Sequence, residues 1–194
     1  MALFRNKRES DEESGVIREL AGVFLYIMIV LVLIVVIHLY VGERTEVSGD
    51  SMNDTLEDGD SLWLDKLTYH FQDPKRYDIV VFPHIDAVTG NEVLYVKRII
   101  GLPGETISIT DNGNILVDGK TLEESYGKEI IDLYHIGIAS EPIVLGDDEY
   151  FVMGDNRNNS KDSRDPEVGN ISRDELEGRV VFRMWPLQQI GSIK

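Results

Sequence analysis

One segment of this chain constrains its fold more than any other: an unbroken apolar run near the N-terminus. The 22 residues at positions 20–41 include no Asp, Glu, Lys or Arg. As an α-helix with a rise of about 1.5 Å per residue, such a run reaches roughly 33 Å, enough to cross a hydrocarbon core of about 30 Å. A helix buried in a soluble domain is rarely apolar on every face over such a length. The run therefore predicts a transmembrane anchor at residues 20–41.

The closest alternative to an anchor is a cleavable secretory signal. The apolar region of such a signal is usually about 7–15 residues long and precedes a small-x-small cleavage site. Here the run is longer, and the polar sequence Gly-Glu-Arg-Thr-Glu follows it at positions 42–46. We therefore expect an anchor that is retained.

Basic residues on the two sides of the run set its expected orientation, because Lys and Arg near a span favour the cytoplasmic side. Four precede the run within residues 1–19, while Arg44 is the only one among the twenty residues that follow it. This bias predicts a single-pass protein of the cell membrane. A short, flexible cytoplasmic tail is expected at residues 1–19, and an extracytoplasmic domain at residues 43–194.

The composition of the chain excludes several classes of function. Acidic residues number 35 against 19 basic ones, and the net charge of −16 argues against binding to a nucleic-acid backbone. Cysteine is absent, so disulfide bonds, thiolate metal sites and cysteine nucleophiles are ruled out. No HExxH zinc motif is present. We expect no nucleic-acid partner, no metal site and no cofactor.

Residues 43–194 are enough to bury a core, and short β-branched and aromatic runs bounded by turn signals dominate them. These runs predict strands at residues 61–65, 78–82, 92–100, 106–110, 114–118, 150–153 and 179–185. Asp-Asn-Gly at 111–113 and Asp-Gly at 118–119 favour hairpins, because these residue types tolerate a positive φ. One short helical turn is expected at 173–176. The pattern predicts a mainly β, mostly antiparallel domain, with a small β subdomain inserted at about residues 105–145.

Without cysteine, a nucleophile in this chain would be a serine or a threonine. No GxSxG elbow surrounds any serine, and a Ser-His-Asp triad is neither excluded by the spacing nor favoured by any motif. Ser51 lies in a turn of small residues shortly after the predicted span. In isolation this serine is better interpreted as part of a polar turn that joins the anchor to the domain than as a nucleophile.

Lys97 lies next to Arg98 in a predicted strand, so the two side chains point to opposite faces of the sheet. Tyr95 and Ile99 flank Lys97 on its own face, and apolar surroundings disfavour the charged ammonium. Lowering its pKa from about 10.4 to about 8 costs roughly 3.3 kcal/mol, which burial can impose. A neutral lysine could then remove a proton from a hydroxyl. The strand alone favours instead a lysine whose stem is buried and whose ammonium reaches water.

The third candidate segment is Gly-Asp-Asn-Arg-Asn-Asn-Ser-Lys-Asp-Ser-Arg at positions 154–164. Its acidic and amide side chains are spaced like those of a calcium loop, but Arg157 would occupy a ligand position and defeats such a site. The segment fits either a solvated loop or a buried ion-pair network that braces a site. The members of that network would be Asp155, Arg157, Asp162 and Arg164.

Together these segments resemble the type I signal peptidases, membrane-anchored Ser-Lys proteases that cleave secretory signal peptides. The resemblance covers about residues 20–194, and its lysine and Gly-Asp-Asn-Arg motifs are individually specific. The matching motifs are Ser-Gly-Asp-Ser-Met at 48–52, Tyr-Asp-Ile-Val-Val-Phe at 77–82, Tyr-Val-Lys-Arg-Ile-Ile-Gly-Leu-Pro-Gly-Glu at 95–105, Gly-Asp-Asn-Arg at 154–157, Ser-x-Asp-Ser-Arg at 160–164, Gly-Arg at 178–179 and Trp-Pro at 185–186. The resemblance implies an antiparallel β-sheet or coiled β-barrel, in the compact single-span bacterial form of the family.

By position, the resemblance implies that Ser51 is the nucleophile and Lys97 the general base. The Ser51 backbone N–H would be one donor to the oxyanion. Ser160 would hydrogen-bond and orient the lysine amine. The ion-paired scaffold residues would be Arg98, Asp155, Asp162 and Arg164.

The resemblance also implies how a substrate is bound. Shallow pockets would be lined by Val47, Leu56, Tyr95 and Val96, and an extended substrate would add itself as a strand along these segments. Pockets that reject large side chains would favour Ala-x-Ala by exclusion. The implied reaction is removal of signal peptides from secretory preproteins after small-x-small sequences, by an enzyme that contacts membrane lipid and that we expect to be a monomer.

Two positions depart from the family pattern. Asp54 stands where many members have proline, so a proline ring does not restrict the backbone of this turn, while the hydroxyl chemistry is unaffected. Gly49 stands where some members carry a serine whose hydroxyl completes the oxyanion hole, so a second donor must come from elsewhere or is absent.

Three alternative functions differ in what they require. A self-cleaving repressor-type protease shares the Ser-Lys chemistry but would need a DNA-binding domain and no membrane span. A single-span, non-enzymatic surface protein would present the β domain to a partner. A Ser-Lys peptidase dedicated to one substrate would carry the same motifs, because the motifs do not define its clients.

Overall fold

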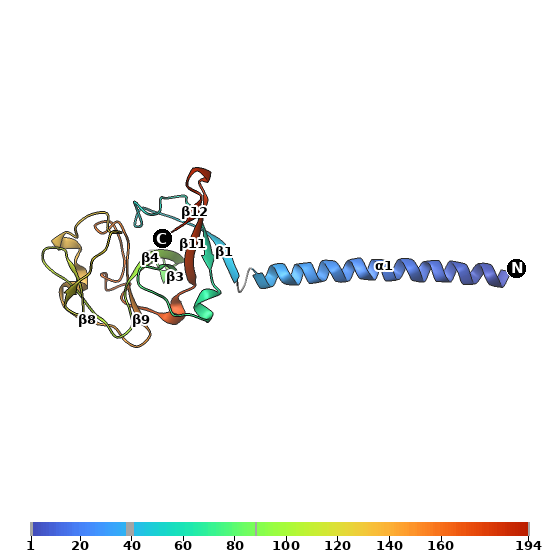
Figure 1. The fold of residues 1–194 in the computed structure, drawn as a ribbon, viewed down its shortest axis with the longest axis horizontal. Coiled ribbons are helices and arrows are strands. Elements are labelled where there is room, and N and C mark those ends of the chain that lie inside the picture. Colours follow the sequence, from blue (N-terminus) through green and yellow to red (C-terminus); the bar gives the residue numbers. More distant parts are fainter. Residues whose placement is uncertain (1, 38–40, 88, 194) are drawn as a thin grey trace. The chain divides into compact units, whose positions relative to one another are not determined.

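The computed structural model describes residues 2–37, 41–87 and 89–193, and the chain divides into two compact units, residues 1–41 and 42–194. The first unit holds the helix α1 (Ala2–Val36), drawn in blue in Figure 1. Within it, Arg18–Val36 is the one helical segment of the described chain that is long and apolar enough to cross a membrane. The predicted span at residues 20–41 falls mostly on this helix, and positions 38–40 lie outside the described residues.

The helix starts at Ala2, well before the predicted span. The expectation of a flexible tail therefore differs from the structure, in which residues 2–19 are helical. Arg, Lys and Glu are frequent in this segment and have high helix propensities. Because the apolar segment already supplies a helical nucleus, these residues extend the helix without the cost of starting a new one.

The second unit consists of antiparallel strands in two sheets, which confirms the predicted mainly β fold. The large sheet has eight strands in the order β1-β2-β11-β3-β4-β9-β10, with β12 paired to β11. Its strands are β1 (Gly42–Glu46), β2 (Ser61–Asp65), β3 (Ile79–Ile85), β4 (Glu92–Gly101), β9 (Glu149–Met153), β10 (Ile171–Ser172), β11 (Gly178–Trp185) and β12 (Gly191–Ser192). Because β11 lies between β2 and β3, this late strand connects the early strands β1 and β2 to the rest of the sheet.

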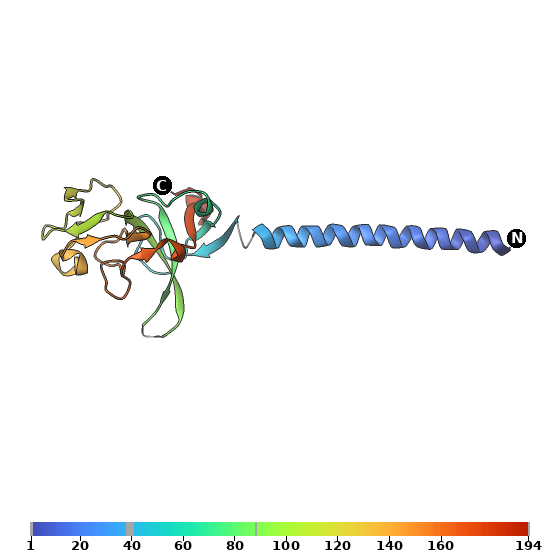
Figure 2. The ribbon, with the colours of Figure 1, turned by 90° about the horizontal axis from the view of Figure 1, so that it is seen from below.

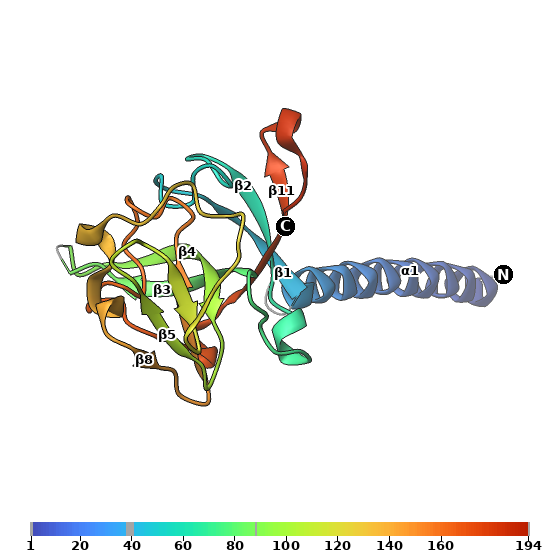
Figure 3. The ribbon, with the colours of Figure 1, turned by 60° about the vertical axis from the view of Figure 1, so that its left-hand side comes forward.

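The small sheet has the order β7-β6-β5-β8 and is an insertion between β4 and β9. Its strands are β5 (Thr106–Ile109), β6 (Ile115–Val117), β7 (Lys120–Thr121) and β8 (Ile143–Val144). Figure 3 shows β5 and β8 at one end of the β domain and β1, β2 and β11 at the other. The inserted subdomain predicted at about residues 105–145 is thus present. Short 3-10 helices occur at η2 (Thr68–His70), η3 (Leu133–His135), η4 (Gly137–Ser140), η5 (Arg173–Glu175) and η6 (Leu187–Gln189).

All seven predicted strands fall on observed strands, and the predicted helical turn at 173–176 falls on η5. The strands β1, β7, β8, β10 and β12 were not predicted. Four of these five have only two residues, and β1 is Gly-Glu-Arg-Thr-Glu, which lacks the apolar alternation that indicates a strand. It forms a strand because it pairs with β2 along its whole length.

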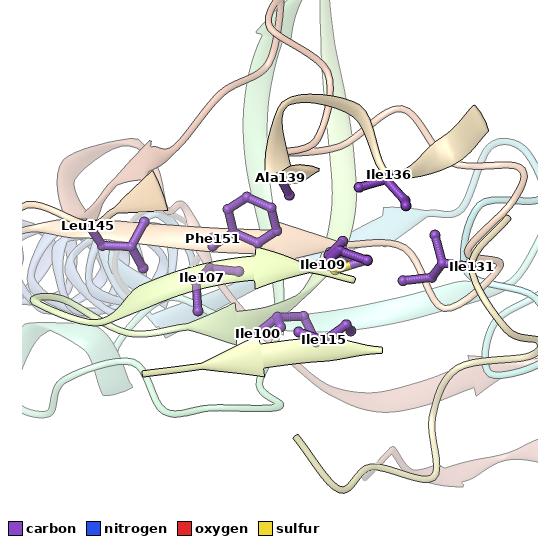
Figure 4. Packing of buried hydrophobic residues seen from close by; sticks show 10 residues of the cluster. Ile100, Ile107, Ile109, Ile115, Ile131, Ile136, Ala139, Leu145 and Phe151 are labelled. Atoms are coloured by element: carbon purple, nitrogen blue, oxygen red, sulfur yellow. The ribbon is translucent and has the colours of Figure 1, made fainter. Parts of the chain in front are cut away.

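Two hydrophobic clusters hold the segments that carry the candidate site. One joins the two sheets, and Figure 4 shows Ile107 and Ile109 of β5 in the same cluster as Phe151 of β9. At this junction a Cβ on Gly101 would come within 2.7 Å of the Leu145 side chain and 2.8 Å of the Ile107 side chain, so any larger residue would force these two side chains to shift.

The second cluster packs the connection between β1 and β2 onto the large sheet. Met52 and Leu56 of this connection are fully buried against Leu62, Val81 and Val96. The segment that contains Ser51 is therefore anchored from below by apolar contacts.

Candidate active site

Ser51 lies in the connection between β1 and β2, residues 47–60. The two ends of this connection are joined, because Val47 N–H donates to Asp60 O at 2.9 Å. Directly after the serine, Met52 is buried in the hydrophobic cluster. A turn closed at its ends and anchored beside the serine holds the hydroxyl in one place.

Lys97 extends from β4 towards this turn. Its Nζ lies 2.8 Å from Ser51 Oγ, within hydrogen-bond distance, and donates to Val96 O at 3.1 Å. The Tyr95 ring centre lies 4.8 Å from the same nitrogen. Lys97 is only 4% exposed. The lysine head is therefore buried beside the serine, not extended into water as the alternative interpretation of the strand requires.

Burial lowers the pKa of Lys97 from its usual 10.5 to about 8, because an ammonium loses its hydration inside the protein. The surrounding charges act in both directions. The negative charges of Asp162 and Asp155 raise the pKa, and the positive charge of Arg164 lowers it, but burial has the largest effect. At about pH 8 a substantial fraction of the molecules therefore has a neutral Lys97 amine that can accept a proton.

Arg98 points to the opposite face of β4, as the strand alternation predicts, and forms a buried bidentate pair with Asp155. Its Nε donates to Oδ1 at 2.9 Å and its Nη2 to Oδ2 at 2.7 Å, and both side chains are 0% exposed. Asp155 Oδ2 also accepts from Thr55 Oγ1 at 2.5 Å. The pair thus connects β4 to the turn that carries Ser51.

Asp162 and Arg164 form the second predicted pair, also bidentate, with both bonds at 2.8 Å. Asp162 accepts a further bond from Gly154 N–H at 3.0 Å. Burial alone would raise the pKa of Asp162, but the bonds and charge of Arg164 and the Gly154 N–H hold it below its usual range. Asp162 is therefore a charged scaffold residue. Arg157, the remaining member of the predicted network, instead pairs with Glu124 of the inserted subdomain.

Ser160 lies at the site, but the predicted hydrogen bond to the lysine is not formed. Its Oγ is buried and close enough to Asp162 to help lower the pKa of that carboxyl. In the described part of the chain, Lys97 Nζ bonds to Ser51 and to Val96 O instead. The lysine amine is therefore oriented by the nucleophile and by its own strand in this structure.

A cleft of about 210 Å³ lies beside Ser51 and Lys97 and is lined by both. Three predicted pocket residues, Val47, Tyr95 and Val96, also line it. Leu56 does not line the cleft, because its side chain is fully buried in the cluster beneath the turn. Its backbone N–H donates to the carbonyl of Met52, which is buried in the same cluster. The lining residues that were not predicted are Ser48, Gly49, Asp50, Met52, Leu94, Asn159 and Lys161.

Sequence reasoning also missed two residues that hold the Ser51 turn, Thr55 and Asn156. Thr55 bonds to Asp155, as described above. Asn156 makes two hydrogen bonds to the main chain of Asp50 and Ser51. Asn156 belongs to the Gly-Asp-Asn-Arg motif but had been given no role, and Thr55 lies three residues after the Ser-Gly-Asp-Ser-Met motif, so nearness to these motifs was the signal that could have drawn attention to them. No group of three or more metal-ligating side chains occurs among the residues that the structure describes.

A serine hydroxyl beside a buried amine, at the edge of a cleft, is the combination that a serine hydrolase needs, because an adjacent base activates the weakly nucleophilic hydroxyl. A helix long and apolar enough to span a membrane precedes the β domain that carries it. Fold and site together are those of a membrane-anchored serine peptidase.

The family model described as signal peptidase, peptidase S26, matches residues 20–185. A signal peptidase I of Leptolyngbya laminosa is 39% identical, over 84% of this chain and 78% of the relative. A probable signal peptidase I-2 of Synechocystis is 38% identical, over 83% of this chain and 71% of the relative. A crystal structure of a signal peptidase I from Enterococcus faecalis is 32% identical, covers 56% of this chain and 97% of its own, and has a TM-score of 0.43. By its family model and these relatives, the chain belongs to the signal peptidase family and is a serine endopeptidase.

Proposed function

We propose that this chain cleaves signal peptides from exported preproteins, with Ser51 as the nucleophile and Lys97 as the general base. The proposal is carried by the 2.8 Å separation of Lys97 Nζ and Ser51 Oγ. A general base must lie within about 2.6–3.2 Å of the proton that it removes and should titrate near the working pH. The distance and a lysine pKa of about 8 both support this pair.

The reaction proceeds in two half-reactions. Neutral Lys97 takes the Ser51 proton while Oγ attacks the scissile carbonyl carbon, and the ammonium then gives that proton to the leaving amine of the mature chain. The signal peptide remains as an ester on Ser51. Lys97, neutral again, takes a proton from water, which attacks the ester, and the proton returns to Oγ as the signal peptide leaves.

The backbone N–H of Ser51 is the donor to the oxyanion in this proposal. It has no hydrogen-bond acceptor among the described residues, so it is available to a substrate. The N–H of Gly49 is already used, because it donates to Asp58 Oδ1 at 2.7 Å. Gly49 has φ +93°, a conformation that a serine would adopt only with strain. We therefore assign the Ser51 N–H as the one oxyanion donor, and expect stabilisation of the oxyanion to depend heavily on the direction in which this N–H points.

An extended substrate is supported by the strand pairing around β4. β3 pairs with β4 along residues 92–98, whereas β9 pairs with it only from Arg98 onward. The other edge of β4 at residues 92–97 has no strand partner in the described chain, and Figure 2 shows β3 and β4 extending together as a hairpin. A peptide can add main-chain hydrogen bonds along such an edge. The small cleft favours small side chains before the scissile bond, which supports a small-x-small preference.

The anchor supports a preprotein substrate on energetic grounds. We take the catalytic domain to be extracytoplasmic and the N-terminus cytoplasmic, as the distribution of basic residues predicts. A preprotein held in the same membrane by its own apolar segment meets the cleft at a high effective concentration. Weak pockets then suffice for recognition, and a monomer in contact with lipid can carry out the reaction.

The full-length protein in detergent, incubated with a labelled preprotein that carries an Ala-x-Ala site, tests the proposal. We expect cleavage by the natural chain and none by Ser51→Ala, with the same thermal unfolding midpoint for both. Full turnover by Ser51→Ala would reject the nucleophile, and failure of the natural chain to cleave any preprotein would favour the surface-protein alternative. Cleavage of a single member of a preprotein panel would indicate a peptidase dedicated to one substrate.

A further inference from the structure

Asn156 connects the Gly-Asp-Asn-Arg loop to the two residues that carry the proposed nucleophile. Its Nδ2 donates to Asp50 O at 3.0 Å, and its backbone N–H donates to Ser51 O at 3.0 Å. A carbonyl oxygen can only accept, so the amide nitrogen of the side chain must face Asp50. Asn156 is 8% exposed, so water does not readily replace it as a donor.

The bond to Asp50 O acts on the same peptide unit that contains Ser51 N–H. The C=O of Asp50 and the N–H of Ser51 belong to one planar, trans peptide group, in which they point in opposite directions. A donor that fixes the carbonyl therefore fixes the direction of the N–H. Asp50 O also accepts from Asn53 N–H at 3.2 Å within the turn, and Asn156 is the donor that ties this carbonyl to the neighbouring loop. The Ser51 N–H has no acceptor among the described residues and belongs to a residue that lines the cleft.

The same bond also strengthens the donor. Hydrogen bonds that share a peptide group polarise one another, so a bond accepted by the carbonyl makes the N–H a better donor. This effect is greatest when a negative charge develops on the substrate oxygen, because the interaction with an oxyanion is charge-assisted. A contact made by Asn156 to the main chain is therefore expected to act mainly on the transition state.

The geometry points to Asn156 as a positioning residue that aims the Ser51 N–H at the oxyanion of the tetrahedral intermediate. This inference rests on the proposed function of Ser51 and adds a residue outside the dyad and its ion pairs. Asn156 touches neither the substrate nor the reacting atoms. Its role is exerted through the Asp50–Ser51 peptide group.

Asn156→Ala isolates the bond to Asp50, because the backbone N–H that bonds to Ser51 O is retained. We expect kcat to fall about 10- to 100-fold, less than the 10²–10³ that complete loss of an oxyanion donor costs. KM and the midpoint of the rising limb of the pH–rate profile should stay unchanged within about twofold and a few tenths of a pH unit. Asn156→Asp should be lower still, since a carboxylate facing Asp50 O repels the carbonyl and turns the peptide group away.

Asn158→Ala is a matched control in the same loop. The Asn158 side chain makes two hydrogen bonds, accepting from Asp132 N–H and donating to Ile130 O, both at 2.9 Å, and its backbone N–H donates to Glu129. These bonds lead to the inserted subdomain and not to the nucleophile. We expect kcat of Asn158→Ala to stay within about twofold of the natural chain. An equal loss in both variants, or an unchanged kcat in Asn156→Ala, would overturn the inference.

A spectroscopic measurement separates this inference from the proposed function. In the full chain labelled with ¹⁵N-serine, the Ser51 amide signal is assigned by its disappearance in Ser51→Ala. Asn156→Ala should shift that signal, while Asn158→Ala should leave it in place. An unmoved Ser51 signal in Asn156→Ala would overturn the inference even if preproteins are cleaved, and a moved signal supports the positioning role whatever the outcome of the preprotein assay.

Discussion

Replacing Lys97 by methionine should stabilise the β domain while abolishing activity. Methionine has a similar length and flexibility but carries no charge to bury. Lowering the lysine pKa from 10.5 to about 8 corresponds to a cost of about 3 kcal/mol for keeping the ammonium in the folded protein. Against this stand the bonds to Ser51 Oγ and Val96 O, each worth about 0.5–1.5 kcal/mol. The expected net gain at neutral pH is up to about 2 kcal/mol.

The gain must depend on pH in a defined direction. Above pH 10.5 the lysine is neutral in both the folded and the unfolded chain, so its charge costs nothing. Between 10.5 and about 8 the unfolded chain binds a proton that the folded chain does not, and the cost grows as the pH falls. Below about pH 8 the cost is complete. The advantage of Lys97→Met should therefore be full at pH 6–7 and disappear near pH 10.5.

Thermal unfolding of the full chain in detergent, followed by tryptophan fluorescence, measures this difference. Both tryptophans, Trp63 and Trp185, lie in the β domain, so the signal reports its unfolding. We expect a midpoint up to about 8 °C higher for Lys97→Met at pH 7. Lys120→Met, at an exposed strand position, is the matched control and should change stability by less than about 0.5 kcal/mol. A Lys97→Met variant that is less stable than the natural chain at pH 7, by an amount independent of pH, would refute the reasoning.

Three further predictions concern the surroundings of the lysine. Activity should rise with pH through a midpoint near 8. The positive charge of Arg164 lowers the pKa of Lys97, so its removal in Arg164→Met should raise that pKa and move the midpoint upward. An unmoved midpoint in pH–rate profiles would contradict this. Asp155→Ala leaves Arg98 buried and unpaired and should destabilise the domain by about 3–5 kcal/mol in thermal unfolding. Gly154→Ala should reduce preprotein cleavage strongly, since its Cβ would clash with the backbone of the nucleophile.

The strands of this protein were accessible from its sequence because their signals are local. A β-branched run such as residues 92–100 indicates a strand whatever surrounds it, and all seven predicted strands exist. The pairing order of the strands was not accessible. β11 inserts between β2 and β3, and nothing in the sequence of any of these three strands specifies that neighbour.

The candidate site shows the same limit at the level of single residues. Ser51 and Lys97 were named from motifs, but their 2.8 Å separation depends on packing between residues 46 positions apart. The prediction that Leu56 lines the cleft was wrong, because a position in a motif does not specify to which side of a turn the side chain points. Asp54, where many family members have proline, pairs with Lys128 of the inserted subdomain at 3.2 Å, and no local pattern specifies that partner.

The arrangement of the buried charges around Lys97 explains why they do not hold its pKa at the usual value. Asp155 is engaged by the fork of Arg98, and Asp162 by the fork of Arg164, each through two parallel bonds. A carboxylate whose two oxygens already face a guanidinium is a poor partner for a second cation, because its charge is largely compensated. In the described chain the amine therefore bonds to a hydroxyl and a carbonyl and to no carboxylate, and burial dominates its pKa. Because each of the two carboxylates is already paired with an arginine, burial can lower the pKa of Lys97 to about 8, where a substantial fraction of the amine is neutral, as a general base requires.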